Sequence, residues 1–378
     1  MCYEIHSIER TMKCTQKIER NENMFLALNE MKKNKFRFAL VIGVLMLVSY
    51  LVYFLSGLAT GLQDMNRESV DKWDSTHVVL TEESDKSLFE SSLSTNDLAD
   101  IDADDVAVLG QLNAIARNDD EKANVSIFGI HNDEFIMPHV TEGKEFSADN
   151  EVIAGDALKE DGFAIGDELQ VSSSDEVLTI VGFTDKALFS AAPVLYMDIA
   201  TFHNIKFGEG AEQNDDKINA IVVRSGGETI HVDNDSLELI KTEDFIKNLP
   251  GYTEQNITLT FMIYFLFVIS AVIVAIFLYV LTVQKISMFG IMKAQGISSG
   301  YLARSVVAQT FLLAASGVVI GFMLTIITGV FLPSAVPVSF DYITMAVYGM
   351  VLIVVAILGA IFSVMTIIRI DPLEAIGG

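Results

Sequence analysis

The stretch 38–62, FALVIGVLMLVSYLVYFLSGLATGL, contains no charged residue and is long enough to cross a lipid bilayer as a single helix. A helix needs about 20 apolar residues to span the hydrocarbon core. Three further stretches meet this length, at 258–283, 306–332 and 342–368. The sequence therefore predicts an α-helical membrane protein with four transmembrane helices, in which the large segment 63–257 separates the first span from the second.

The composition agrees with a membrane protein that carries one acidic soluble domain. Hydrophobic residues make up 51% of the 378 residues, yet the formal net charge is −25. Most of the 50 acidic residues lie between the first two spans. Such a surface repels nucleic acid, so we expect no nucleic-acid partner.

Basic residues indicate which side of the membrane each segment faces. Cytoplasmic loops carry an excess of lysine and arginine. Eight such residues flank the spans at their predicted inner ends: Lys32, Lys33, Lys35, Arg37, Lys285, Lys293, Arg304 and Arg369. We therefore predict a plasma-membrane protein with a cytoplasmic N-terminus, coupling segment (284–305) and C-terminal tail (369–378). Segment 63–257 and the loop 333–341 then face outward.

The N-terminal region divides into two parts. Residues 1–23 are polar and lack the apolar core of a signal peptide, so they are either a real extension or the result of a start codon assigned too early. Residues 24–37 place Phe25, Leu28 and Met31 at helical spacing, which predicts an amphipathic helix on the inner membrane surface. A basic flank that only sets the topology would explain the lysines without that apolar stripe.

The outer segment 63–257 has the pattern of a mixed α/β domain. EVIAGDALKEDGFAIGDELQV (151–171) reads as a strand, a short helix, a Gly-Asp turn and a second strand. DIDADDVAVLGQ (100–111) imitates a calcium-binding loop, but Asp105 replaces the required glycine and Gln111 the required glutamate. We therefore predict no metal site in this domain.

No constellation of catalytic residues is evident along the chain. The phosphate-binding pattern G-x-x-x-x-G-K-[ST] is missing, and no Ser-His-Asp or Cys-His set stands out. We predict a protein that is not an enzyme by itself, with no catalytic residue and no intrinsic cofactor.

FGIMKAQGISSGYLA (289–303) separates the second and third spans and contains more than a turn requires. Ile286, Phe289 and Met292 recur every third residue, which predicts a short helix with an apolar stripe. Gly296 can end this helix in the left-handed conformation, and Ser298 can cap the next one. An exposed apolar stripe needs cover, so we expect the bilayer or a partner to contact it.

Several segments resemble the MacB/FtsX-type ABC transporter permeases. FGIMKAQGISSGYL (289–302) is similar to their coupling segment and RIDPLEAIGG (369–378) to their C-terminal ending. Residues 24–38 are similar to their interfacial helix, and 151–197 to their extracytoplasmic domain. One position departs from the pattern, because Met288 stands where many members carry an acidic residue.

This resemblance implies a specific assembly. The coupling segment of the family docks on a separate cytoplasmic ATPase, and two permeases work with two ATPases. ATP-driven closure then moves the outer domains, a scheme called mechanotransmission. Carried over to this chain, the ATPase contacts are Phe289, Met292, Lys293 and Gly296.

The first span also resembles the haem-exporting HrtB group of this family, through its ending SGLATGL (56–62). Gly57 and Gly61 form a G-x-x-x-G face, which allows close helix approach in lipid, so we predict a dimer interface between two copies there. The same helical stripe continues to polar residues at the outer membrane boundary. The haem-binding candidates are Asp64, Met65, Glu68, Tyr53, Tyr252 and Tyr342. The tyrosines also fit an ordinary interfacial aromatic belt.

The sequence leaves three functions open. The leading one is a permease subunit that exports haem, with ATP hydrolysed by the partner. The first alternative is an exporter for resistance to antimicrobial peptides or lipopeptides. The second is an FtsX-like transmitter that activates a cell-wall hydrolase and transports nothing.

Overall fold

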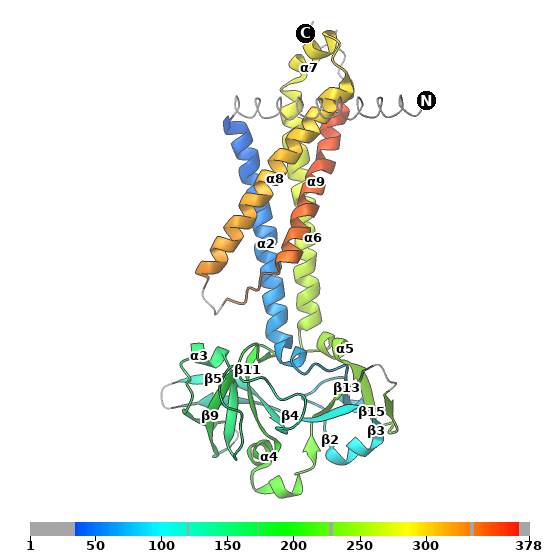
Figure 1. The fold of residues 1–378 in the computed structure, drawn as a ribbon. Coiled ribbons are helices and arrows are strands. Elements are labelled where there is room, and N and C mark those ends of the chain that lie inside the picture. The colour runs from blue at the N-terminus through cyan, green and yellow to red at the C-terminus, as the bar shows by residue number, and fades with distance from the viewer. Residues whose placement is uncertain (1–34, 119–120, 173, 227–229, 333–335, 370–378) are drawn as a thin grey trace, which may run out of the picture. The chain divides into compact units, whose positions relative to one another are not determined.

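The computed structural model describes residues 35–118, 121–172, 174–226, 230–332 and 336–369. The chain divides into two compact units. The membrane unit comprises residues 1–61 and 258–378, and the outer unit comprises residues 62–257. Two helices, α2 and α6, run without interruption from one unit into the other (Figure 1). The predicted interfacial helix at 24–37 and the tail at 369–378 lie almost entirely outside the described residues.

Among the described residues, four helices are long and apolar enough to cross a membrane, which confirms the predicted fold class. The helices are α2 (Lys35–Asp71), α3 (Ala157–Glu160), α4 (Ile199–Phe207), α5 (Thr242–Lys247), α6 (Tyr252–Val283), α7 (Ile286–Ala294), α8 (Ser299–Phe331) and α9 (Tyr342–Arg369). At 1.5 Å per residue, α2 is about 55 Å long, well beyond the roughly 30 Å of a hydrocarbon core. Its last ten residues belong to the outer unit.

The membrane unit is a bundle of α2, α6, α8 and α9 with small residues at the contacts (Figure 1). A Cβ atom added to Gly317 or Gly321 of α8 would collide with α2 around Leu45 and Ser49. The hydroxyl of Ser49 donates to the carbonyl oxygen of Gly317, at 3.2 Å. Small residues thus allow α2 and α8 to approach closely, as is common in lipid, where packing replaces the hydrophobic effect.

The outer unit is built on one large mixed sheet with short helices around it (Figure 1). In the described part of the chain, β2 pairs with β12 and β3 with β14 in two small separate sheets, and the other strands form the large sheet. The strands are β1 (His77–Thr81), β2 (Leu93–Ser94), β3 (Ile101–Asp102), β4 (Asp105–Arg117), β5 (Lys122–Ile130), β6 (Glu142–Gly143), β7 (Glu151–Gly155), β8 (Glu168–Val171), β9 (Val177–Thr184), β10 (Leu188–Phe189), β11 (Ala192–Asp198), β12 (Lys217–Ile218), β13 (Ala220–Arg224), β14 (His231–Val232) and β15 (Leu237–Lys241). Three 3-10 helices accompany them, at Glu82–Ser84, Thr95–Asp100 and Gly208–Gln213.

Strand pairing closes part of this sheet on itself. β5 pairs with both β4 and β11, and β8 pairs with both β4 and β9. Together with β7 between β11 and β9, these strands form a closed ring of six. β4 is long enough, at 13 residues, to continue into a second row with β13, β1 and β15. The predicted α/β domain between the first two long helices is therefore confirmed.

The outer end of α2 is embedded in the core of the outer unit. Val70 and Trp73 are fully buried there. The Trp73 ring lies 6.0 Å from Phe128 and 6.1 Å from Phe245, between ring centroids. Because Trp73 packs against both the sheet and α5, the helix end is fixed to the domain that follows it.

Candidate functional site

The predicted coupling helix is present as α7, and its end has the geometry that the sequence indicated. Gly296 has φ +90°, in the left-handed region. The N–H of Gly296 donates to the carbonyl of Lys293, and that of Ile297 donates to the carbonyl of Met292. These two bonds define a Schellman motif. The hydroxyl of Ser298 accepts from the N–H of Tyr301 and so caps α8 as expected.

The apolar stripe of α7, however, does not face outward as predicted. Phe289 is buried against Leu302 and Val306 of α8, and Met292 packs on the same cluster. The tight turn at Gly296 brings α8 back onto this face, so the chain covers its own stripe. Phe289 and Met292 therefore pack α7 against α8.

The exposed face of α7 lies on its other side. Met288 and Ile291 are 44% and 47% exposed, and Ala294 and Gln295 continue the same face. The sequence reasoning missed this face as a contact surface, although Met288 was already notable as a departure from the family pattern. Lys293 is half-buried and already makes an interaction within the chain.

The face of α2 that carries Gly57 and Gly61 is covered by the segment before α9. A Cβ on Gly57 would lie 2.6 Å from the Phe340 ring, and one on Gly61 would collide with the carbonyl of Pro337. The N–H of Ser339 also donates to the carbonyl of Gly57, at 3.0 Å. This arrangement does not support the predicted dimer contact through these glycines, because their face is occupied by the same chain.

Three of the haem candidates lie together on the outer end of α2. Asp64, Met65 and Glu68 are half-buried, within the ten residues that belong to the outer unit. Burial raises the pKa of Glu68 to about 7, and the negative charges of Asp64 and Asp156 add to this rise. The backbone N–H of Leu188 and the charge of Lys186 oppose it. The site thus offers a thioether and a half-buried carboxyl one helical turn apart.

Arg67 connects this helix end to α6 and was not singled out from the sequence. Its guanidinium forms a two-point ion pair with Asp71, at 2.7 and 2.8 Å. It also donates to the hydroxyl of Tyr252, at 3.4 Å, and to Glu243, at 3.2 Å. The only sequence signal was an arginine four residues before an aspartate in a strongly acidic segment.

The three candidate tyrosines differ in their environments. Tyr252 is buried in the outer unit, and Arg67 holds its hydroxyl. Tyr53 is buried in the membrane bundle, where its ring packs edge-on against Phe322 at 5.8 Å. Neither ring is available to a ligand in this conformation. Tyr342 is exposed, as the first residue of α9.

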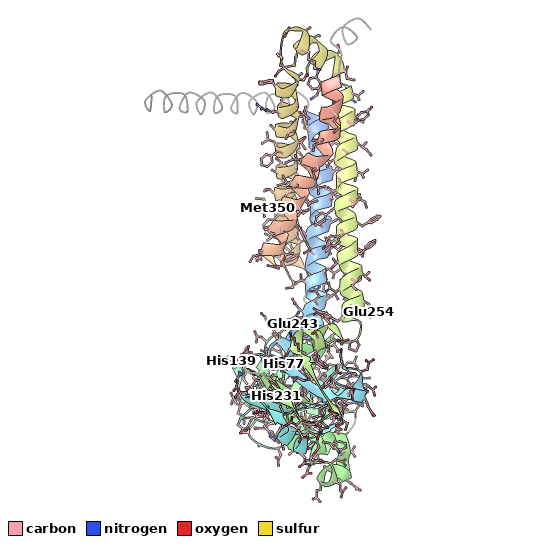
Figure 2. The ribbon with its side chains drawn as sticks, turned by 90° about the vertical axis from the view of Figure 1, so that its right-hand side faces the viewer. His77, His139, His231, Glu243, Glu254 and Met350 are labelled. Atoms are coloured by element: carbon pink, nitrogen blue, oxygen red, sulfur yellow. The ribbon has the colours of Figure 1, made fainter. Side chains whose placement is uncertain are left out.

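The metal-ligating side chains of the outer unit do not gather at one place in the part of the chain that the structure describes. No group of three or more His, Cys, Asp or Glu residues there could hold a metal ion. Three histidines of the outer unit are labelled in Figure 2: His77 is in β1, His231 is in β14, and His139 follows β5 outside any strand. In the calcium-like loop, Asp104 accepts from the N–H of Gly226 and Asp105 pairs with Arg224. The structure thus uses these carboxylates in its own hydrogen bonds.

The fold and the site define a class of protein: a membrane-embedded permease subunit with a domain on the outer side. Family models match both parts of the chain. The MacB-like periplasmic core domain covers residues 38–232, and the FtsX-like permease C-terminal domain covers residues 260–372. The chain belongs to the MacB/FtsX family of ABC transporter permeases. As such a permease, it works with a separate ATPase.

Curated relatives match nearly the whole chain. Hemin transport system permease proteins named HrtB are 25% identical over 358 residues in Staphylococcus haemolyticus and 28% identical over 368 residues in Staphylococcus epidermidis. Each match covers 94% of this chain and 99% of the relative. An uncharacterised ABC transporter permease of Mycobacterium tuberculosis is 23% identical, also over 94% of this chain.

Two solved structures match the outer region. The periplasmic region of MacB from Actinobacillus actinomycetemcomitans is 13% identical, with a TM-score of 0.34, and covers 47% of this chain and 94% of that chain. The extracellular domain of the transporter YknZ is also 13% identical, with a TM-score of 0.29, and covers 40% of this chain and 84% of that chain.

Proposed function

We propose that this permease exports haem from the cell membrane, as part of a complex with two copies of this chain and two copies of a cytoplasmic ATPase. The observation that carries the proposal is the full-length similarity to hemin transport permeases. Haem is the cargo, and ATP is hydrolysed by the partner. We expect both termini on the cytoplasmic side and membrane lipid around the bundle.

The outer end of α2 offers suitable chemistry for this cargo. Haem is a flat apolar ring whose iron accepts thioether and carboxylate ligands, among others. Met65 and Glu68 supply both ligand types from one face of the helix, beside the outer membrane boundary. A ring that enters from the outer leaflet would find its apolar surface matched by lipid and its iron by these side chains.

The ATPase contact is the exposed face of α7. We propose that Met288 and Ile291 insert into the ATPase, while buried Phe289 transmits the movement to α8. A short helix packed on a long one moves as a rigid body, so ATPase closure can tilt α8 and its neighbours. This gives mechanotransmission a specific contact in this chain.

The α7 face is tested by charge substitution. Met288→Asp with Ile291→Asp should abolish co-purification of the ATPase, because two charges would be buried in an apolar contact. The control, Met288→Leu with Ile291→Leu, should retain the ATPase. Equal ATPase recovery with both variants would place the coupling contact elsewhere.

The haem site is tested by hemin titration of the purified complex. Met65→Ala with Glu68→Ala should weaken binding and shift the Soret band. The matched control, Met350→Ala with Glu254→Gln, changes an exposed methionine and an exposed glutamate outside this face (Figure 2). An unchanged spectrum in Met65→Ala with Glu68→Ala would mean that haem binds at another site. If the wild type binds no hemin, the cargo is a peptide or the complex is a transmitter without cargo.

A further inference from the structure

The β10–β11 hairpin contacts the turn of α2 that carries Met65 and Glu68. The N–H of Ala191 donates to the carbonyl oxygen of Met65, at 2.9 Å. The N–H of Ser190 reaches the carbonyl oxygen of Asn66, at 3.4 Å. The N–H of Leu188 faces the Glu68 carboxyl. Three successive parts of one hairpin thus contact one turn of the helix, all within the outer unit.

The turn of this hairpin has an unfavourable sequence for its shape. Ser190 and Ala191 are its two central residues, and their φ angles are +49° and +64°. Two-residue turns of this kind normally carry Asn-Gly or Gly, because other residues are strained at positive φ. Lys186, just before β10, also has a positive φ, of +43°. Strain in such a segment persists only when its surroundings hold it in place.

The other side of the hairpin is fixed to the aromatic core. Phe189 is buried, and its ring centroid lies 5.2 Å from that of Phe128. Phe128 is also the ring that contacts Trp73, at the end of α2. The hairpin is therefore held at two places, through Phe189 in the core and through its turn on α2. A turn without strain would place Phe189 in the core equally well. We therefore associate the strain with the contact of the turn on α2.

We propose that the strained turn Ser190–Ala191 is a positioning element that holds the Met65–Glu68 face of α2 in the geometry in which it binds an iron porphyrin. This inference rests on the proposed function. The turn contacts the backbone carbonyls of Met65 and Asn66, and both Met65 and Glu68 keep part of their surface exposed. It acts through Met65 and Glu68 and does not itself ligate the iron.

Two substitutions at the turn change the strain in opposite directions. Ala191→Val places a β-branched residue at φ +64°, which should open the turn and weaken hemin binding by about tenfold. Ser190→Asn with Ala191→Gly keeps the turn shape with less strain, and should keep hemin affinity within about twofold of wild type. Both are measured on the purified complex with its ATPase, by hemin titration.

A double-mutant cycle separates positioning from general damage. In the Met65→Ala/Glu68→Ala background, Ala191→Val should cause no further loss of hemin affinity, because the face that it positions is gone. An equal loss in both backgrounds, or no loss in either, would overturn the proposal. Hydrogen exchange gives a measurement without haem. The backbone amide of residue 191 should exchange faster than wild type in Ala191→Val. In Ser190→Asn with Ala191→Gly, it should exchange no faster than wild type.

A failure of the proposed haem-export function can be distinguished from a failure of the positioning proposal. If the wild-type complex binds no hemin, the haem assignment falls, and with it the positioning of a porphyrin site. The hydrogen-exchange rates at residue 191 would then still show whether the turn is hydrogen-bonded to α2. If the wild type binds hemin but exchange at residue 191 is the same in all variants, only the positioning proposal is overturned.

Discussion

Gly296 shows how one residue determines the geometry of the coupling segment. Its Cβ position is empty space, as is that of Gly300 four residues later, but only Gly296 has a positive φ. A side chain at either position therefore meets no neighbour. Substitutions at Gly296 and Gly300 therefore differ in the backbone strain that a side chain would cause, and neither creates a steric clash.

We therefore predict opposite effects of two alanine substitutions. Gly296→Ala should cost roughly 1–2 kcal/mol in the α7–α8 turn and reduce ATP-driven export. Gly300→Ala, in the first turn of α8, should be neutral or stabilising by up to about 1 kcal/mol. Thermal unfolding of the complex and its export rate measure both. Equal behaviour of the two variants would mean that the left-handed turn is dispensable.

The close packing at Gly61 leads to a second prediction at the scale of single residues. Its added Cβ would lie 2.3 Å from the backbone oxygen of Pro337, which cannot give way as a flexible side chain can. Gly61→Ala should displace residues 336–340 and destabilise the bundle by about 1–3 kcal/mol. Gly43→Ala on the same helix meets nothing within 4 Å and should be tolerated. Thermal melts in detergent compare them, and a stable Gly61→Ala protein would contradict the observed packing.

At the scale of elements, the end of α2 is the point where a membrane helix becomes part of a soluble core. Trp73 is fully buried, while its indole Nε1 has no hydrogen-bond partner among the described residues. The ring is thus held by packing within a buried apolar cluster that includes Phe128 and Phe245. Packing of this kind depends strongly on the volume of the side chain.

Substitution of Trp73 should show this difference. Trp73→Ala should destabilise the outer unit by about 3–5 kcal/mol, since it empties a large buried volume. Trp73→Phe should cost clearly less, because it keeps an aromatic ring and removes a buried donor without a partner. Urea unfolding of the purified chain, followed by circular dichroism, gives both values. Equal losses would mean that the indole nitrogen is bonded in solution.

Local signals predicted local structure well, and long-range contacts explain the rest. The four long apolar runs and the caps at Gly296 and Ser298 are encoded within a few residues. The sequence carried the helical stripe of α2 as far as Glu68, but the burial of Val70 and Trp73 beyond it was not predicted, because it depends on a sheet formed later in the chain. Two further contacts were not predicted. Phe289 of α7 packs on Leu302 across the turn at Gly296, and Gly57 is covered by Phe340, which is distant from it in the sequence.

At the scale of the whole molecule, two continuous helices connect the membrane unit with the outer unit. Within the outer unit they are tied together, because Gln63 donates to Asn256 at 2.8 Å and Arg67 reaches Tyr252. Movement of α2 relative to α6 must therefore break these bonds or move both helices together. This supports the proposal that ATPase closure reaches the outer unit through the helix pair, in the manner of mechanotransmission.

The central claim is that ATP hydrolysis by the partner removes haem from the membrane through this permease. The most direct test is hemin release from proteoliposomes that contain the complex, after addition of ATP. We predict ATP-dependent hemin release by the wild type and by the Met350→Ala/Glu254→Gln control, and strongly reduced release by Met65→Ala/Glu68→Ala. Wild-type release by that last variant would contradict the proposed site, and a wild-type complex that hydrolyses ATP without releasing hemin would contradict the haem cargo itself.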